Sequence, residues 1–61
     1  MKIEVEWKSI ASGITTIDIT DLCKNGKEWD ELSKKEQEKR INQWLLDNEY
    51  KAYRDLSWEK I

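Results

Sequence analysis

Residues 2–8 alternate between polar and apolar side chains. One side of this stretch carries only charged residues, and Ile3, Val5 and Trp7 share the other side. A hydrophobic period of two predicts a β-strand with one face against a core.

A second alternating stretch covers residues 14–20 and is rich in β-branched side chains, which favour strands. The side chains predicted to face the core are Thr15, Ile17 and Ile19. Five residues separate the two stretches, too many for a two-residue turn, and the last of them is Gly13, which tolerates a positive φ. We therefore predict an antiparallel hairpin over residues 2–20.

Beyond the hairpin the spacing becomes helical. Asn25-Gly26 is a turn signal, and we expect a short helical turn inside a linker over residues 21–33. Ser33 and Glu36 form a capping box, in which a hydroxyl and a carboxylate satisfy free backbone N–H groups, so a helix is predicted to begin at residue 34. Its apolar stripe is predicted to contain Ile41, Trp44 and Leu45.

The main helix is predicted to cover residues 34–55, with Asp47-Asn48 as an alternative end. The last segment, residues 56–61, suits a strand or a helix, and we favour a short extended tail that packs on the hairpin or on a partner subunit. An isolated hairpin is barely stable in water, so the helix must cover one face of it. The predicted fold is a single α+β domain over residues 1–61, in which a small antiparallel β-hairpin packs against one main α-helix (ββα).

The chain has few means of stabilising so small a domain. A domain of 61 residues buries only about 60% of the surface that its unfolded chain exposes. Cys23 is the only cysteine and histidine is absent, which excludes an intrachain disulfide, the usual zinc sites, and Ser/His or Cys/His nucleophile pairs. We therefore expect a homo-oligomer, a dimer or a tetramer, that completes the fold.

The charge balance excludes several kinds of partner. Eleven basic and thirteen acidic residues give a net charge of −2, so no general basic field attracts duplex nucleic acid or an anionic membrane. No apolar run approaches the roughly 20 residues that cross a bilayer, and no signal-peptide core is present, so we expect a cytosolic protein. The carboxylates are spread evenly and are interpreted as solvated surface charges, so we expect neither an enzyme nor a metal or cofactor site.

Four tryptophans are many for this core, because each aromatic side chain buries on the order of 150–250 Å². Trp7 and Trp44 lie on the apolar faces of their own elements and are interpreted as core residues. Trp29 and Trp58 are flanked by charges, and each has three possible roles: core, subunit interface or ligand stacking. We expect a functional surface built from the linker, the tail and a neighbouring subunit.

Two segments carry residues suited to a ligand. Aromatic and basic side chains alternate over residues 50–54, a pattern that stacks a base and holds a phosphate but also suits a helix C-terminus. The hairpin loop offers hydroxyls and backbone N–H groups beside Lys8, which suit a phosphate or a sugar edge; an ordinary polar turn is the alternative.

Several short motifs resemble those of a family of very small phage proteins, the anti-CBASS sponge proteins. The motifs are Glu-Trp7-Lys, Ser12-Gly13, Trp29-Asp-Glu-Leu-Ser33-Lys-Lys-Glu36 and Ser57-Trp58-Glu59, and they extend over nearly the whole chain. Ser12 stands where the resemblance leads us to expect threonine. Proteins of that family assemble as oligomers and sequester cyclic nucleotide signals without cleaving them.

The resemblance implies a phage immune-evasion protein of the host cytoplasm, whose ligand is a cGAMP-like cyclic dinucleotide. Such a ligand presents two bases for stacking, for which Tyr53 and Trp58 are the candidates. Its phosphates and riboses need cations, hydroxyls or N–H donors, for which the candidates are Lys8, Ser12, Gly13, Thr15 and Arg54. The alternative is a phage inhibitor that binds a host protein directly, as an anti-CRISPR or host-takeover protein does, with the same aromatics as anchors.

Overall fold

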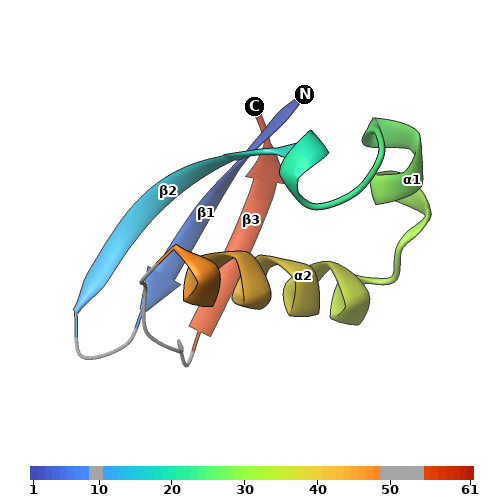
Figure 1. Ribbon diagram of the computed structural model, residues 1–61. Helices are drawn as coiled ribbons and strands as arrows, with labels where there is room; N and C mark the ends of the chain where they lie inside the picture. The colour runs from blue at the N-terminus through green and yellow to red at the C-terminus, as the bar shows by residue number, and fades with distance from the viewer. Residues whose placement is uncertain (9–10, 49–54) are drawn as a thin grey trace.

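The computed structural model describes residues 1–8, 11–48 and 55–61 (Figure 1). Strands come first and last in the chain, with the helices between them. The elements are β1 (Lys2–Lys8), β2 (Ser12–Asp18), the 3-10 helix η1 (Ile19–Asp21), α1 (Gly26–Glu31), α2 (Lys34–Asp47) and β3 (Asp55–Lys60). The α+β class is therefore confirmed.

The strands form one three-stranded antiparallel sheet in the order β2-β1-β3. The predicted strand over residues 2–8 is confirmed as β1, the central strand. In the register of the sheet, Val5 lies opposite Thr15 of β2 and opposite Trp58 of β3. The predicted tail is thus extended and packs on the hairpin, but it does so as a full third strand, which the ββα layout lacked.

The second strand lies two residues earlier than predicted. β2 ends at Asp18, whose side chain accepts a hydrogen bond from the backbone N–H of Thr20 and caps η1. This cap turns the chain away from the sheet, so Ile19 belongs to η1. Ile17 and Ile19 are nevertheless both buried, as the alternating pattern predicted.

Both helices begin at a side-chain cap. Ser33 Oγ accepts a hydrogen bond from the backbone N–H of Glu36, as the capping box predicted, and α2 begins at residue 34. Asn25 caps α1 in the same way by accepting from the backbone N–H of Glu28 at 2.8 Å. The short helical turn expected in the linker is therefore α1.

The main helix is shorter than predicted. α2 ends at Asp47, and Asn48 forms its C-cap with two hydrogen bonds to the carbonyl oxygen of Trp44, one from its backbone and one from its side chain. Asp55 already belongs to β3. The prediction of one helix over residues 34–55 is wrong at its C-terminal end, and the alternative end at Asp47-Asn48 is the one observed, because Asn48 leaves helical backbone angles and its side chain bonds to a carbonyl oxygen of the last turn.

The core lies between the helices and one face of the sheet, which we call the inner face. Its members are nearly inaccessible to solvent, and they are Ile3, Val5, Ile17, Ile19, Trp29, Ile41 and Leu45. Trp29 is only 2% exposed, which decides among its three possible roles in favour of the core. Trp44 is half-buried and packs against this cluster from α2.

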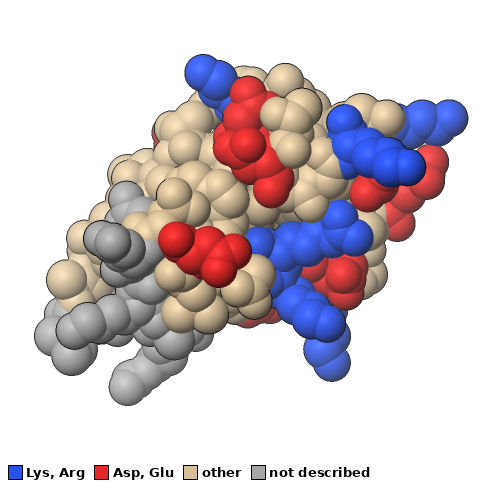
Figure 2. Space-filling model, viewed as in Figure 1, with Lys and Arg blue, Asp and Glu red and all other residues tan. Residues whose placement is uncertain are grey.

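The opposite, outer face of the sheet carries the charged residues of β1 and is not covered by any helix of the described chain (Figure 1). On the helix side, acidic and basic side chains are interspersed (Figure 2).

Candidate functional site

The hairpin brings four of the predicted ligand-binding residues to its open end. The register pairs Lys8 with Ser12, Trp7 with Gly13 and Val5 with Thr15. Lys8 and Ser12 are exposed on the outer face, and Gly13 and Thr15 lie on the inner face. The open end of the hairpin thus presents candidate residues on both faces of the sheet.

Trp7 lies directly over Gly13. A Cβ atom added to Gly13 would come within 3.0 Å of three ring atoms of Trp7, so no side chain fits between the indole and this strand. Trp7 Nε1 donates a hydrogen bond of 3.1 Å to Thr15 Oγ1, which fixes the plane of the ring. Trp7 is half-buried, so part of its surface is accessible.

A hollow of about 320 Å³ opens at this end of the hairpin. It is lined by Glu6, Trp7, Lys8, Ser12, Gly13 and Ile14. The ammonium group of Lys8, the hydroxyl of Ser12 and the carboxylate of Glu6 belong to the outer face, and the indole of Trp7 belongs to the inner face of the same strand pairs. This set suits a ligand that has a flat ring, an anionic group and hydrogen-bond donors.

Three of the lining residues were not among the sequence-based candidates, namely Glu6, Trp7 and Ile14. Trp7 was interpreted only as a core residue, because alternation along one strand does not show what lies across from it. A register that pairs Lys8 with Ser12 also pairs Trp7 with Gly13. A large residue opposite a glycine is the signal that could have identified the position of Trp7.

Trp58 does not join the residues at the hairpin end. It lies on the inner face of β3, opposite Val5, and packs against the core. Its Nε1 donates a hydrogen bond of 3.1 Å to Gln37 Oε1 of α2. A hollow of about 220 Å³ beside it is lined otherwise by Ser57 and by three carboxylates, those of Glu4, Glu6 and Glu59. That surface has the wrong charge for a phosphate.

The other candidates, Tyr53 and Arg54, lie outside the described residues, as does the whole alternating stretch over 50–54. The stacking role expected of Tyr53 and the phosphate contact expected of Arg54 stay predictions.

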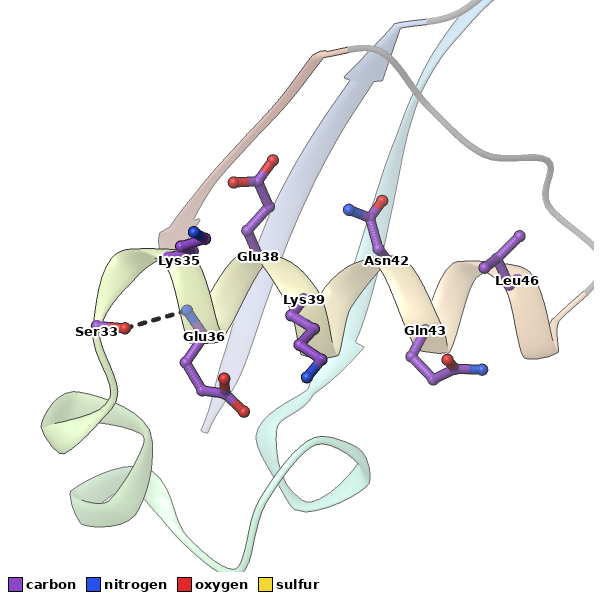
Figure 3. A pocket seen from close by; sticks show the side chains of 8 residues that line it. All are labelled: Ser33, Lys35, Glu36, Glu38, Lys39, Asn42, Gln43 and Leu46. Atoms are coloured by element: carbon purple, nitrogen blue, oxygen red, sulfur yellow. Dashed lines mark hydrogen bonds between the residues drawn. The ribbon is translucent and has the colours of Figure 1, made fainter.

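A larger hollow of about 550 Å³ runs along the solvent side of α2. Its lining residues are Ser33, Lys35, Glu36, Glu38, Lys39, Asn42, Gln43 and Leu46, which all come from this helix and its N-cap. Their side chains point in different directions and do not converge (Figure 3). A ligand there would touch a single convex surface, so the hairpin end is the better candidate.

A smaller cleft of about 180 Å³ lies between η1 and α2 and is lined in part by Arg40 and Trp44. The guanidinium group of Arg40 is already engaged, because it donates to the carbonyl oxygen of Leu22 at 2.9 Å and lies 3.5 Å from carboxylate oxygens of Glu28 and Glu36. These bonds join the linker to α2, so we interpret Arg40 as a structural residue.

The titration of Asp18 is also explained by structure. Hydrogen bonds from the backbone N–H and the hydroxyl of Thr20 stabilise the carboxylate and hold the pKa of Asp18 below its ordinary value.

Within residues 1–8, 11–48 and 55–61, no group of three His, Cys, Asp or Glu side chains could hold a metal ion. In the same part of the chain, no helix is long and apolar enough to cross a membrane.

Comparisons with protein-family models, with curated proteins and with solved structures find no match to this chain.

Proposed function

We propose that this protein is a phage immune-evasion protein that binds a cyclic dinucleotide at the open end of its hairpin and sequesters it without cleaving it. The observation that supports this most is the open end of the hairpin, where Trp7 on the inner face and Lys8 and Ser12 on the outer face belong to neighbouring strand pairs and line one hollow. This end of the hairpin thus offers a stacking surface on one face and a cation with a hydroxyl on the other, the two kinds of contact that a nucleotide needs.

The rigidity of the indole supports the proposal. The Trp7 ring is held from below by Gly13 and at its edge by Thr15, so stacking a base on it costs little side-chain entropy. The Thr15 hydroxyl is already hydrogen-bonded to Trp7, so we assign Thr15 a positioning role and do not assign it to the ribose.

The size of the hollow supports a site that holds one half of the ligand. Small-molecule pockets span about 300–1,000 Å³, and this hollow is at the lower end of that range with about 320 Å³. One chain therefore has room for about one nucleotide unit. The carboxylate of Glu6 repels a phosphate, so we assign the phosphate to Lys8. We assign to Glu6 the role of accepting a hydrogen bond from an amino or imino N–H of a base.

Calorimetry against a panel of cyclic di- and trinucleotides tests the proposal. We expect heat from at least one cyclic dinucleotide, and mass spectrometry after heat denaturation should recover that ligand intact. Absence of heat from every member of the panel would exclude the sponge function, and recovery of a linear product would replace it with a hydrolase.

The alternative, an inhibitor that binds a host protein, is favoured by one observation. Glu4 lies directly opposite Glu59 on the uncovered outer face, an unfavourable pairing of like charges that a basic partner surface would relieve. Capture of one stoichiometric host protein by the natural chain, with loss of capture by Glu4→Gln with Glu59→Gln, would support this function. Capture that is unchanged by the two substitutions would count against it.

A further inference from the structure

The two edges of the sheet differ in how they are protected. β3 carries Asp55, Glu59 and Lys60, and the Lys60 ammonium group forms an ion pair with Asp30 of α1. Charged side chains on an edge strand oppose pairing with another chain. β2 has no charged residue before Asp18, its last position, and its central residues are β-branched. An uncharged, β-branched edge of seven residues favours the addition of a strand.

No described element lies beyond β2. The sheet order places β2 at one edge, and Figure 1 shows this strand on the outside of the molecule, away from α1. The backbone N–H and C=O groups of β2 that point away from β1, at the edge of the sheet, therefore have no strand partner within the described residues.

The exposed apolar side chains gather on the same side. Apart from the terminal residues Met1 and Ile61, the exposed large hydrophobic residues of the described chain are Ile14 and Leu46. Ile14, on the outer face of β2, is 64% exposed. Leu46 is 49% exposed and lies in the last turn of α2, whose C-terminal end is on the β2 side of the sheet (Figures 1 and 3). Of these two residues, Ile14 is the one that belongs to the β2 edge itself.

We propose that β2 pairs with β2 of a second copy of this chain, antiparallel and centred on Ile14, to form a continuous six-stranded sheet. A two-fold axis at Ile14 places the two Ile14 side chains opposite each other and Ser12 opposite Thr16 of the second copy. The same register sets Gly13 opposite Thr15 of the second copy. No position in the pairing brings like charges together, because Ser12 to Ile17 are all uncharged. The axis at Ile14 is preferred to one at Thr15, which would leave Ile14 opposite a threonine.

The second copy is favoured as occupant over a foreign peptide because β2 is complementary to itself. Across the axis Ser12 meets Thr16 and Gly13 meets Thr15, so each hydroxyl-bearing residue faces another hydroxyl or a glycine. The same symmetry places the α2 helices of both copies on one face of the joint sheet.

The pairing has a consequence that rests on the proposed function. The two hairpin-end hollows would lie on either side of one two-fold axis, each lined by Ser12 and Gly13 that pair with the other chain. A cyclic dinucleotide also has two similar halves, so a symmetric pair of hollows would supply one stacking surface and one cation to each half.

Sedimentation velocity from micromolar to millimolar concentration tests the pairing without any ligand. The natural chain should dimerise, and Ile14→Lys, which sets two ammonium groups face to face, should raise the dimer dissociation constant by about tenfold or more. Ile61→Lys is the matched control: Ile61 is 68% exposed at the other end of the sheet, and its substitution should leave the dimer unchanged. A natural chain that stays monomeric, or a dimer that Ile14→Lys does not weaken, would overturn the proposal.

Cross-linking tests the register. Residues paired directly across antiparallel strands have Cα atoms about 4.5–5.5 Å apart, within the roughly 4.4–6.8 Å that a disulfide spans. In a Cys23→Ser background, Ile14→Cys should form a covalent dimer under mild oxidation, whereas Thr16→Cys should not. Cross-linking through position 16 but not through position 14 would overturn the proposed register. Because no nucleotide is involved, failure of these tests is distinguishable from failure of the proposed function.

Discussion

The indole of Trp7 occupies the space that any side chain at position 13 would need. Gly13 lies opposite Trp7 in the β1–β2 register, and a Cβ atom there would come within 3.0 Å of three ring atoms. The glycine is therefore required by packing against an aromatic ring. Both residues line the hairpin-end hollow, so this relationship links the stability of the hairpin to the proposed site.

Gly13→Ala should therefore destabilise the protein by about 1–3 kcal/mol, because the added methyl group must displace the indole. Thermal unfolding followed by circular dichroism measures this loss. Gly26→Ala is the matched control, since the nearest atoms there belong to the flexible end of Met1 and the residue begins α1. A Gly13→Ala variant as stable as Gly26→Ala would contradict the packing described here.

Trp29→Ala should cost roughly 3–5 kcal/mol, because the side chain is 2% exposed within the core. At the usual 0.05–0.15 kcal/mol per residue, 61 residues correspond to a total stability of about 3–9 kcal/mol. The substitution should therefore remove about a third or more of the total stability. Urea titration checks this, with the exposed Leu46→Ala as control; equal midpoints for the two variants would refute a core role for Trp29.

Trp58 and Gln37 should behave as a coupled pair. Gln37 accepts the indole N–H of Trp58 at 3.1 Å and donates to the carbonyl oxygen of Trp29 at 2.8 Å, so one side chain joins α1, α2 and β3. A double-mutant cycle of Trp58→Phe and Gln37→Met should show a coupling energy of about 0.5–1.5 kcal/mol. Strictly additive losses would mean that the bond contributes nothing to stability.

Acid should weaken the cap of η1. Hydrogen bonds from Thr20 hold the pKa of Asp18 below its ordinary value, so the carboxylate stabilises the folded state above the pKa that it has in the unfolded chain. This contribution is lost as pH falls through the lower pKa of the folded state. Asp18→Asn should flatten this part of the stability–pH curve, whereas Asp21→Asn in the same turn should leave it in place. Parallel curves for the natural chain and Asp18→Asn would contradict the assignment.

The local elements were predictable because each has a local signal. Alternation identified β1, and the capping hydroxyl of Ser33 located the start of α2. The third strand was not predictable as such, because its pairing with β1 joins residues more than forty positions apart, such as Val5 and Trp58. The burial of Trp29 was equally hidden: its helix has six residues and no apolar stripe, so only tertiary packing shows which side faces the core.

The candidate site was predictable only in part. Lys8, Ser12 and Gly13 were proposed from loop chemistry, and they do line one hollow. Trp7 was missed as a lining residue, because its strand pattern indicated only an inner-face position. The expected surface of linker and tail included Trp29, which is buried in the core.

Calorimetric titration of Lys8→Met with a cyclic dinucleotide tests the proposed function most directly, with Lys2→Met as the matched control. Both lysines belong to the outer face of β1, but only Lys8 lines the hollow. A charge-assisted hydrogen bond contributes about 1.5–3 kcal/mol, so Lys8→Met should weaken binding by about 10–100-fold while Lys2→Met binds as the natural chain does. Equal loss of affinity in both variants, or no binding by the natural chain, would contradict a nucleotide site at the hairpin end.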